Sequence, residues 1–552
     1  MIAATVDNVT VAYASTTVLH GLSCEAHDDR IAGLVGSNGS GKSTLLNVIA
    51  GLIRPSAGAV SLRTGLRVGF LPQQPVFSPG RTVFDTVRLG AQQILKIEQD
   101  LLDVEAQLSN PQIYEDAVAL QRVLAQQETL LTAFDRLGGP GVETRVRSLL
   151  HTLGFEPSDY NRPVGVLSGG QKKLIGIAAQ ALERPDLLLL DEPDNHLDLR
   201  GKTFLERFLR DYSGGVVLVS HDRYLLDLVA DEILEVEAKS LHRFVGNYSE
   251  YAAEKEVLRA QHEHRYADQQ KELSRLRQSA DRLMMWGRVA DNVKFIRRAQ
   301  AIEKRIERME KIDAPHVDRR MRLRLDGWRG STKVLDVSDL HKSFPAQSEG
   351  GEPNVVLDGV DLLLRHGERV GLLGPNGSGK SVLFRLIRGE EAADAGDVRL
   401  GPSVKVGYYA QQHETLDLSR SPIGNLRYHA GISETRAVQT LQRFAFTYEQ
   451  SRRPAGDLSG GERSRLQLAM IMVGCPNFLL LDEPTNNLDI ASAEILEDAL
   501  DGFEGTVLAI SHDRYFLDRV VDRITELHGG RIVESIGGYS TYATRQTGGG
   551  TQ

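Results

Sequence analysis

Two segments of the chain combine several glycines with a lysine and a serine, which is the composition of a phosphate-binding loop. Each segment follows an apolar stretch that predicts a strand and leads into a stretch that predicts a helix, as this kind of loop requires. The glycines allow successive backbone N–H groups to surround phosphate oxygens, and the helix N-terminus adds a favourable dipole. The predicted phosphate-binding residues are Gly36, Ser37, Asn38, Gly39, Ser40, Gly41, Lys42, Ser43 and Thr44 in the first segment, and Gly374, Pro375, Asn376, Gly377, Ser378, Gly379, Lys380, Ser381 and Val382 in the second.

We expect Lys42 and Lys380 to reach the terminal phosphates of a nucleoside triphosphate, and the hydroxyl groups of Ser43 and Ser381 to bind Mg²⁺. A glycine-rich loop can occur by chance, but two copies in matching contexts argue against that reading. Val382 stands where the first copy has a threonine, so the second loop lacks one hydroxyl group.

Two apolar runs end in adjacent carboxylates, Asp191-Glu192 and Asp482-Glu483. The carboxyl ends of buried strands are where α/β sheets present their ligands, although an acidic pair after a strand is also common in plain turns. We predict that each aspartate holds the hydrated Mg²⁺ and that each glutamate accepts a proton from the attacking water.

A histidine follows each of two later apolar runs, and a glutamine precedes each acidic pair. His221 and His512, both within SHDRY, are predicted to contact the terminal phosphate, although a lone histidine there is more often structural. An amide can contact both water and Mg²⁺, so Gln73 and Gln411 are candidates for both roles. The predicted catalytic residues are Glu192, Glu483, His221, His512, Gln73 and Gln411, and the predicted metal ligands are Ser43, Asp191, Gln73, Ser381, Asp482 and Gln411.

The spacing of these motifs shows that the chain contains one unit twice. In both halves 37 positions separate the first loop glycine from the glutamine, and 29 separate the glutamate from the histidine. Two copies of one α/β fold follow, which we place at residues 1–250 and 326–545, with a flexible tail at 546–552. Between glutamine and signature serine, the first copy has 95 positions and the second 48. The excess, near 91–137, has helical spacing broken near Asn110 and Pro111 and predicts a two-helix arm.

The segment between the copies, residues 251–325, has a different composition. Its apolar residues recur at steps of three and four and predict two helices paired as an antiparallel hairpin. Residues 259–324 contain 18 Lys and Arg against 10 Asp and Glu, whereas the whole chain has a net charge of −9. A solvated helical spacer is the alternative, but the sign of the charge and the MMWGR sequence at the predicted tip favour a binding role.

Composition limits the classes of protein that remain. No run approaches the roughly 18 apolar residues that a membrane-spanning helix needs. The first residues lack a basic segment followed by an apolar one, so we expect a cytoplasmic protein with no stable membrane insertion. Two cysteines are too few for a disulfide framework or a zinc cluster.

The sequences LSGGQ and LSGGE add what a simple phosphate-loop enzyme lacks, and with them the chain resembles the ATP-binding cassette (ABC) ATPases over both halves. The resemblance implies ATP and Mg²⁺ as ligands, ATP hydrolysis, and two cassettes that meet head to tail within one monomeric chain. It implies that the site on Lys380 is completed by Ser168, Gly169, Gly170 and Gln171, and the site on Lys42 by Ser459, Gly460, Gly461 and Glu462. Tyr13 and Phe344 match the aromatic residue that stacks on adenine.

Two cassettes, no membrane domain and a charged helical linker resemble subfamily F (ABC-F). Its members bind the ribosome at the tRNA exit site, and their linker reaches toward the P-site tRNA and the peptidyl-transferase centre of the ribosomal RNA. Some members displace ribosome-targeting antibiotics and others act as translation factors. By this likeness the candidate RNA contacts are Arg282, Arg288, Lys294, Arg297 and Arg298.

Two departures from the family pattern DEPTNHLD stand in this chain, Asp194 in the first copy and Asn487 in the second. They bring the equality of the two nucleotide sites into question. Two other functions stay open on the sequence: the energy module of a transporter with separate membrane subunits, which would have no evident use for the basic linker, and a DNA-handling ATPase, which normally carries zinc modules or long coiled coils.

Overall fold

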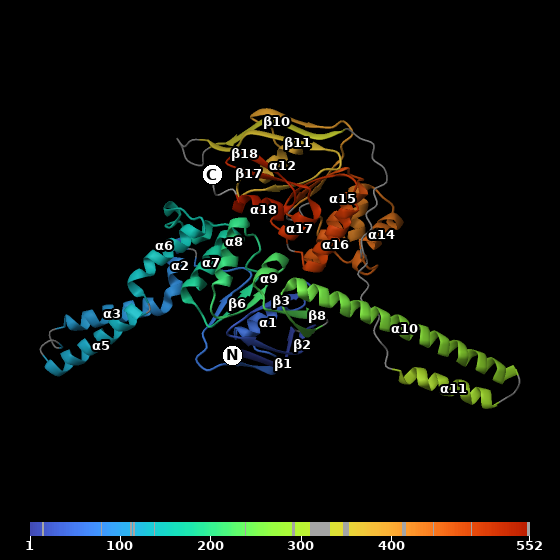
Figure 1. The fold of residues 1–552 in the computed structure, drawn as a ribbon, viewed down its shortest axis with the longest axis horizontal. Coiled ribbons are helices and arrows are strands. Elements are labelled where there is room, and N and C mark those ends of the chain that lie inside the picture. Colours follow the sequence, from blue (N-terminus) through green and yellow to red (C-terminus); the bar gives the residue numbers. More distant parts are fainter. Residues whose placement is uncertain are drawn as a thin grey trace. The chain divides into compact units, whose positions relative to one another are not determined.

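The computed structural model describes residues 1–13, 16–78, 80–110, 113, 116–136, 138–237, 239–289, 293–309, 332–345, 353–410, 416–444, 446–486 and 488–548. The chain divides into two compact units. One consists of Met1–Asn247 with Arg320–Gln552 and contains both repeated halves, and the other is Tyr248–Arg319. Figure 1 labels the elements of both units.

The first half is built on a six-stranded sheet with strand order β5-β6-β7-β3-β8-β9. All neighbouring strands are parallel except β8 and β9. A smaller antiparallel sheet of order β2-β1-β4 accompanies it. The strands are β1 (Ile2–Tyr13), β2 (Thr16–His27), β3 (Ile31–Gly36), β4 (Ala57–Leu62), β5 (Val68–Leu71), β6 (Leu187–Asp191), β7 (Gly215–Val219), β8 (Glu232–Glu237) and β9 (Ser240–Val245).

The second half repeats both sheets, with orders β14-β15-β16-β12-β17-β18 and β11-β10-β13. The prediction of two α/β cassettes joined by a helical hairpin is therefore confirmed. The strands are β10 (Lys333–Phe344), β11 (Asn354–Arg365), β12 (Arg369–Leu373), β13 (Ala395–Leu400), β14 (Val406–Tyr409), β15 (Phe478–Asp482), β16 (Thr506–Ile510), β17 (Arg523–His528) and β18 (Arg531–Ile536).

Helices cover the parallel sheets. In the first half they are α1 (Lys42–Ile49), α2 (Val83–Arg88), α6 (Val142–Thr152), α7 (Gly169–Glu183), α8 (Leu199–Arg210) and α9 (Arg223–Val229). In the second they are α12 (Lys380–Ile387), α13 (Pro422–Ala430), α14 (Glu434–Arg443), α15 (Gly460–Val473), α16 (Ile490–Asp501), α17 (Arg514–Val520) and α18 (Tyr539–Gly548). Helix α18 thus continues into the range that we expected to be a tail, and residues 549–552 lie outside the described residues.

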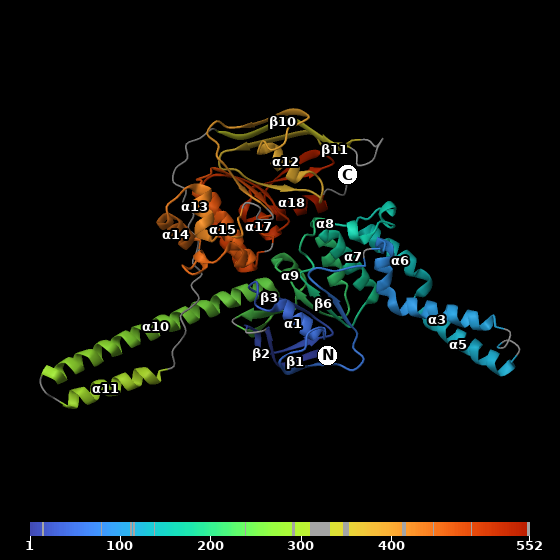
Figure 2. The ribbon, with the colours of Figure 1, turned by 180° about the vertical axis from the view of Figure 1, so that it is seen from behind.

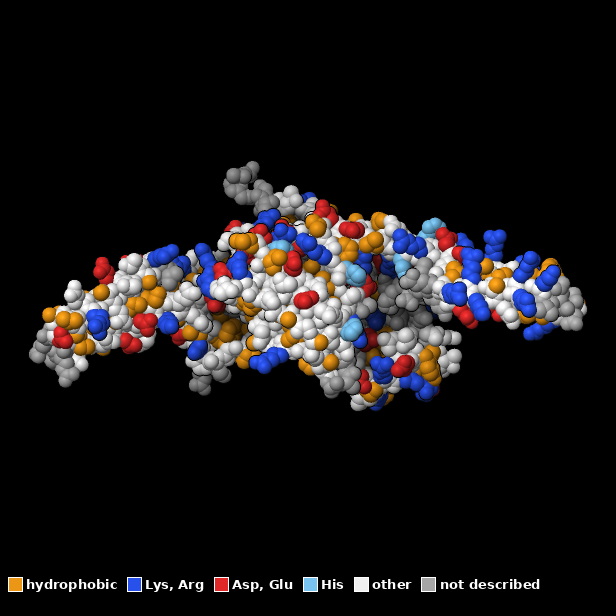
Figure 3. Space-filling view, turned by 90° about the horizontal axis from the view of Figure 1, so that it is seen from below, with side chains coloured by type: hydrophobic (Ala, Val, Ile, Leu, Met, Phe, Trp, Pro, Cys, Tyr) orange, Lys and Arg blue, Asp and Glu red, His pale blue; other side chains and the backbone are white. Residues whose placement is uncertain are grey.

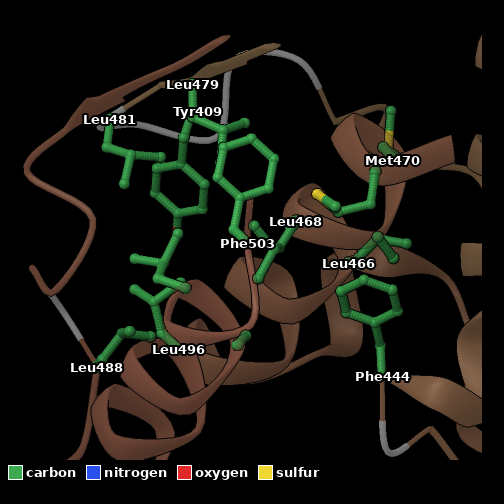
Figure 4. Packing of buried hydrophobic residues seen from close by; sticks show 14 of the residues in the cluster. Tyr409, Phe444, Leu466, Leu468, Met470, Leu479, Leu481, Leu488, Leu496 and Phe503 are labelled. Carbon is green, nitrogen blue, oxygen red and sulfur yellow. The ribbon is translucent and has the colours of Figure 1, made fainter. Parts of the chain in front are cut away.

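The central strands are continuous apolar runs because both of their faces are buried. Every residue of β6 and of β15 is buried, including the aspartate that ends each strand. In the second half Tyr409 of β14 and Leu481 of β15 pack with Phe503 and with residues of α15 and α16 in one cluster (Figure 4). This packing fixes the strand ends from which the acidic side chains project.

The predicted arm is present as two helices, α3 (Gln92–Leu108) and α5 (Ala117–Arg136). They lie side by side (Figure 2), with Val104 and Val123 buried and further apolar residues of both helices half-buried. The predicted break at Asn110 falls between the two helices, and Pro111 lies outside the described residues.

The second unit contains α10 (Tyr248–Val289) and α11 (Val293–Arg308), which pack against each other and which we call the hairpin. Helix α10 begins three residues before the predicted boundary because Tyr248 and Tyr251 are both buried in its first turn. Ala280 and Ala299 are buried at the seam, and Arg305 forms an ion pair with Glu272 at 3.3 Å. Residues 310–325 of the predicted linker lie outside the described part. No described helix is both long and apolar enough to cross a membrane.

Candidate active site

The loop between β3 and α1 holds its lysine over the backbone. Lys42 Nζ donates to the carbonyl oxygens of Gly36 at 2.8 Å and Ser37 at 3.0 Å. Gly36 has φ 148°, and a Cβ atom there would lie 2.5 Å from the carbonyl oxygen of Val236, so only glycine fits. Burial lowers the pKa of Lys42, while Glu192, Asp489 and Asp191 oppose that shift.

The loop between β12 and α12 has the same geometry. Lys380 Nζ donates to the carbonyl oxygens of Gly374 at 2.7 Å and Pro375 at 2.9 Å. Gly374 has φ 152°, and a Cβ atom there would lie 2.4 Å from the carbonyl oxygen of Leu527. The buried hydroxyls of Ser40 and Ser378 have no hydrogen-bond partner among the described residues, so each loop has an unused donor that fits a phosphate oxygen.

The aspartate at the end of each central strand lies beside its loop. Ser43 Oγ donates to Asp191 Oδ1 at 3.1 Å, which brings together two predicted Mg²⁺ ligands. Tyr408 donates its hydroxyl to Asp482 Oδ2 at 3.4 Å. Burial raises the pKa of Asp191, and burial together with Glu483 raises the pKa of Asp482 to about 6. Buried carboxylates whose charged form is disfavoured in this way suit a bound cation.

The following glutamates have an unusual backbone conformation. Glu192 and Glu483 both have φ 48°, and their N–H groups donate to Val219 and Ile510 at 2.9 Å. A glutamate in the left-handed region is strained, and its surroundings must hold it there. Gln73 Nε2 donates to Glu192 Oε2 at 2.7 Å, so the predicted glutamine and glutamate do meet in the first half. Gln411 lies outside the described residues, as does Asn487.

Each histidine lies against the glutamate of its own half. His221 Nε2 is 3.7 Å from Glu192 Oε1, and His512 Nε2 is 3.4 Å from Glu483 Oε1. Burial, followed by Lys42, lowers the pKa of His221 to about 4, and burial, followed by Lys380, lowers that of His512 to about 3. Both rings are therefore neutral at pH 7, and within the described part of the chain their ring nitrogens have no hydrogen-bond partner.

The signature residues begin two helices. Ser168 caps α7 and Ser459 caps α15, each in a reciprocal arrangement with the side chain three residues later, Gln171 or Glu462. Gly169 has open space where a Cβ atom would lie, whereas one on Gly170 would meet the carbonyl oxygen of His196 at 2.4 Å. The exposed N-terminus of each helix can accept an anion.

A cavity of about 650 Å³ joins residues of the two halves. Ser168, Gly169 and Gly170 line it from the first half, and Lys380 and Glu483 line it from the second. The structure thus places the first signature turn and the second phosphate loop on one cavity. The placement of Ser459, Gly460, Gly461 and Glu462 against the Lys42 loop stays a prediction.

The sequence reasoning missed two aspartates that connect the halves. Asn38 N–H donates to Asp489 Oδ2 at 2.9 Å, and Asn376 N–H lies 3.5 Å from Asp198 Oδ2. Each aspartate also caps a helix, α16 or α8. Their identical position in the two copies was a signal in the sequence, but it gave no indication that each would contact the other half.

The remaining predicted residues lie at the edges of the sites. Tyr13 ends β1 with 49% of its surface exposed, and Phe344 ends β10 with Lys342 Nζ 5.4 Å from its ring centroid. Thr44 and Val382 are half-buried in the first turns of α1 and α12. The candidate RNA contacts on the hairpin, Arg282, Arg288, Lys294, Arg297 and Arg298, are all exposed. Figure 3 shows Lys and Arg side chains gathered along the hairpin.

Two phosphate loops, two acidic strand ends and two signature turns on repeated α/β halves define an ATP-binding cassette ATPase. Comparison with protein families agrees: a family described as ABC transporter matches residues 19–195 and 357–486, and a second family with that description matches 234–325. The chain is therefore an ATP hydrolase of this class.

Individual relatives cover nearly the whole chain. The energy-dependent translational throttle protein EttA of Escherichia coli K12 is 34% identical over 529 residues, which cover 94% of this chain and 91% of EttA. The ABC transporter ATP-binding protein YfmR of Bacillus subtilis is 33% identical over 97% of this chain and 83% of its own length. The chain belongs to the tandem-cassette ABC-F family.

Solved structures show the same fold at lower identity. The RNase-L inhibitor superposes with a TM-score of 0.60 at 18% identity and covers 98% of this chain and 93% of its own. The archaeal ribosome recycling factor aABCE1, in complex with the ribosomal stalk protein aP1, gives a TM-score of 0.59 at 16% identity, with 98% and 92% covered.

Proposed function

We propose that this protein is a cytoplasmic, monomeric translation factor that binds the ribosome in its ATP-bound closed form and leaves when ATP is hydrolysed. The observation that carries the proposal is the cavity shared by the Ser168 turn and the Lys380 loop. A nucleotide held between the halves favours the closed arrangement, because its differential affinity for that state shifts the equilibrium.

Each site contains residues suited to one part of the reaction. Lys42 and Lys380 would hold the terminal phosphates, and Ser43, Asp191, Ser381 and Asp482, with Gln73 and Gln411, would hold Mg²⁺. Bound Mg²⁺ supplies charge neutralisation at the transferred phosphoryl group. Burial raises the pKa of Glu483, which makes its carboxylate a better proton acceptor for the attacking water. The neutral His221 and His512 can donate one hydrogen bond toward the terminal phosphate.

The hairpin supports a role on RNA. Its exposed basic side chains offer paired donors for phosphate, and Met285 and Trp286 near its tip are 61% and 54% exposed. The relative EttA is named a translational throttle protein. We therefore favour contact of the hairpin with the P-site tRNA and ribosomal RNA near the peptidyl-transferase centre. Protection against antibiotics is a second outcome of the same contact.

The central test uses a variant that stays in the ATP-bound state. In Glu192→Gln/Glu483→Gln, ATP binds but is hydrolysed at least about 100-fold more slowly, because the proton acceptor is lost. We expect this variant to sediment with ribosomes in ATP and the wild type to do so mainly with a non-hydrolysable analogue. Lys42→Ala/Lys380→Ala is the control that binds neither nucleotide nor ribosome. A trapped variant that sediments free of ribosomes, or that co-purifies with a membrane permease, would contradict the proposal.

The hairpin is tested separately. Replacing Arg282, Arg288, Lys294, Arg297 and Arg298 with glutamine in the trapped variant removes five positive charges from the exposed surface. We expect ribosome binding to fall at least about tenfold and to become less salt-dependent, since each lost phosphate contact lowers the salt slope. ATP binding should be unchanged. Unaltered sedimentation would show that the hairpin is a spacer.

A further inference from the structure

A buried lysine of the first half contacts the catalytic segment of the second. Lys202 lies on α8 with 8% of its surface exposed. Its Nζ donates to Asp222 Oδ2 at 2.8 Å and to the carbonyl oxygen of His512 at 2.9 Å. His512 belongs to the other half, 310 positions away in the chain. Lys202 also lines the cavity that contains the Lys380 loop.

The contact continues to the predicted proton acceptor. The N–H group of His512 donates to Glu483 Oε2 at 3.2 Å, and its ring lies beside Oε1. Lys202 therefore holds the carbonyl group of the residue whose N–H group and ring contact the Glu483 carboxylate. A displaced general base loses rate steeply, because proton transfer needs a heavy-atom separation within hydrogen-bond reach.

The second half has no lysine at the position that could make the equivalent contact with His221 of the first half. Equivalent positions of the halves differ by 291, so Lys202 corresponds to Ala493 and Asp194 to Thr485. Alanine carries no donor that would reach the carbonyl oxygen of His221. In the first half Glu192 is held instead by two side-chain amides of its own half, from Gln73 and Asn195. Among the described residues, which do not include Gln411, the two glutamates thus have different hydrogen-bond donors.

Asp194 lies close to the ion pair that Lys202 forms with Asp222. It is 5% exposed and lies in the same buried group as Lys202 and Asp222. Lys202 pairs directly with Asp222 and interacts electrostatically with Asp194, and Arg514 of the second half approaches Asp222 Oδ2 at 3.8 Å. A buried charge persists only when it is paired in this way. The Asp194 substitution noted in the sequence and Lys202 therefore form one feature of the first half.

We infer that Lys202 is a positioning residue that acts from the first cassette on the nucleotide site of the second, so that hydrolysis at the Lys380 site depends on the first cassette through a contact that the Lys42 site lacks. The inference rests on the proposed roles of Glu483 and His512. It predicts unequal turnover at the two sites.

The test compares Asp194→Thr with Asp194→Thr/Lys202→Ala, which installs the pair that the chain itself uses at Thr485 and Ala493. Single-turnover release of phosphate is measured in a Glu192→Gln background, which reports the Lys380 site, and in a Glu483→Gln background, which reports the Lys42 site. In the first background we expect the double variant to be at least about tenfold slower at saturating ATP, with KM within about twofold of its control. In the second background the two should agree within about twofold.

Equal rates in the Glu192→Gln background, or an equal fall in both backgrounds, would overturn the inference. If the double variant unfolds below the assay temperature, Asp194→Asn with and without Lys202→Met replaces the pair, because asparagine and methionine preserve more of the buried side-chain volume. Failure of the site assignment itself would look different. In that case Glu192→Gln/Glu483→Gln would still hydrolyse ATP.

Discussion

At the scale of single residues, the two halves differ in the groups that contact the predicted catalytic glutamates. Glu192 and Glu483 share a strained backbone angle, but within the described part of the chain different donors contact their carboxylates. The buried histidines beside them are neutral because ionisation within the protein is unfavourable. Their depressed pKa values make stability depend on pH.

The sign of that dependence follows from linkage. Above about pH 6.5 both histidines are neutral in the folded and the unfolded chain. As the pH falls, the unfolded chain takes up protons first, and the folded chain does so only near pH 4 and pH 3. The free energy of unfolding should therefore fall by about 1–2 kcal/mol per histidine between pH 6.5 and 5.

Urea unfolding without nucleotide measures this effect. His221→Asn/His512→Asn should lose less stability than the wild type over the same pH range. The raised pKa of Asp482 makes the folded protein more stable in acid, which opposes the effect of the histidines. Asp482 is present in both proteins, so its contribution cancels in the comparison. Parallel pH profiles for the two proteins would be inconsistent with buried neutral histidines.

Local motifs in the sequence indicated most residues of the candidate site, whereas three contacts across the halves were not predicted. Gly36, Lys42 and Asp191 carry their roles in local motifs, because the loop and the strand end form within one half. Asp198, Asp489 and Lys202 act across the halves. Such contacts depend on how segments between 178 and 451 positions apart are oriented, which no local pattern encodes.

At the scale of elements, apolar spacing predicted both helical pairs and left their ends uncertain. The seam residues of the hairpin are buried or half-buried, as the spacing requires. Helix α10 nevertheless begins earlier than expected and α18 ends later, since tertiary burial and helix propensity extend a helix past the point where its apolar pattern fades.

The contact between α10 and α11 leads to a prediction with a matched control. Ala299 of α11 is fully buried, whereas its neighbour Gln300 is exposed. Ala299→Asp should destabilise the hairpin by about 3 kcal/mol or more, because it buries an unpaired charge, and Gln300→Asp should change it little. Limited proteolysis should cut Ala299→Asp first within residues 248–309 and leave ATP hydrolysis intact. Equal protease resistance of the two variants would contradict the burial of Ala299 between α10 and α11.

At the scale of the whole molecule, reciprocal ion pairs connect the two halves. Arg223 pairs with Glu497 and Arg514 pairs with Glu206, and all four side chains are buried. Each member of one pair lies 291 positions from its counterpart in the other. The halves are therefore joined by contacts that involve no nucleotide.

The two bridges should differ in strength. Both arginines lie over a tyrosine ring, Arg223 over Tyr515 and Arg514 over Tyr224, but Glu497 also contacts Arg519 at 3.1 Å and so keeps a partner when Arg223 is lost. Arg514→Ala should therefore lower the free energy of unfolding by about 3–5 kcal/mol, and Arg223→Ala by less. Chemical denaturation tests this order, and an exchange variant, Arg514→Glu with Glu206→Arg, should recover part of the loss.

An interface in which each side supplies both an arginine and a glutamate is self-complementary. One cassette alone contains every group needed to form both bridges with a second copy of itself, so this contact is compatible with descent from a homodimer whose gene was duplicated and joined. Lys202 has no lysine at the equivalent position of the other half, which is Ala493, and it marks a place where the fused halves have ceased to be interchangeable.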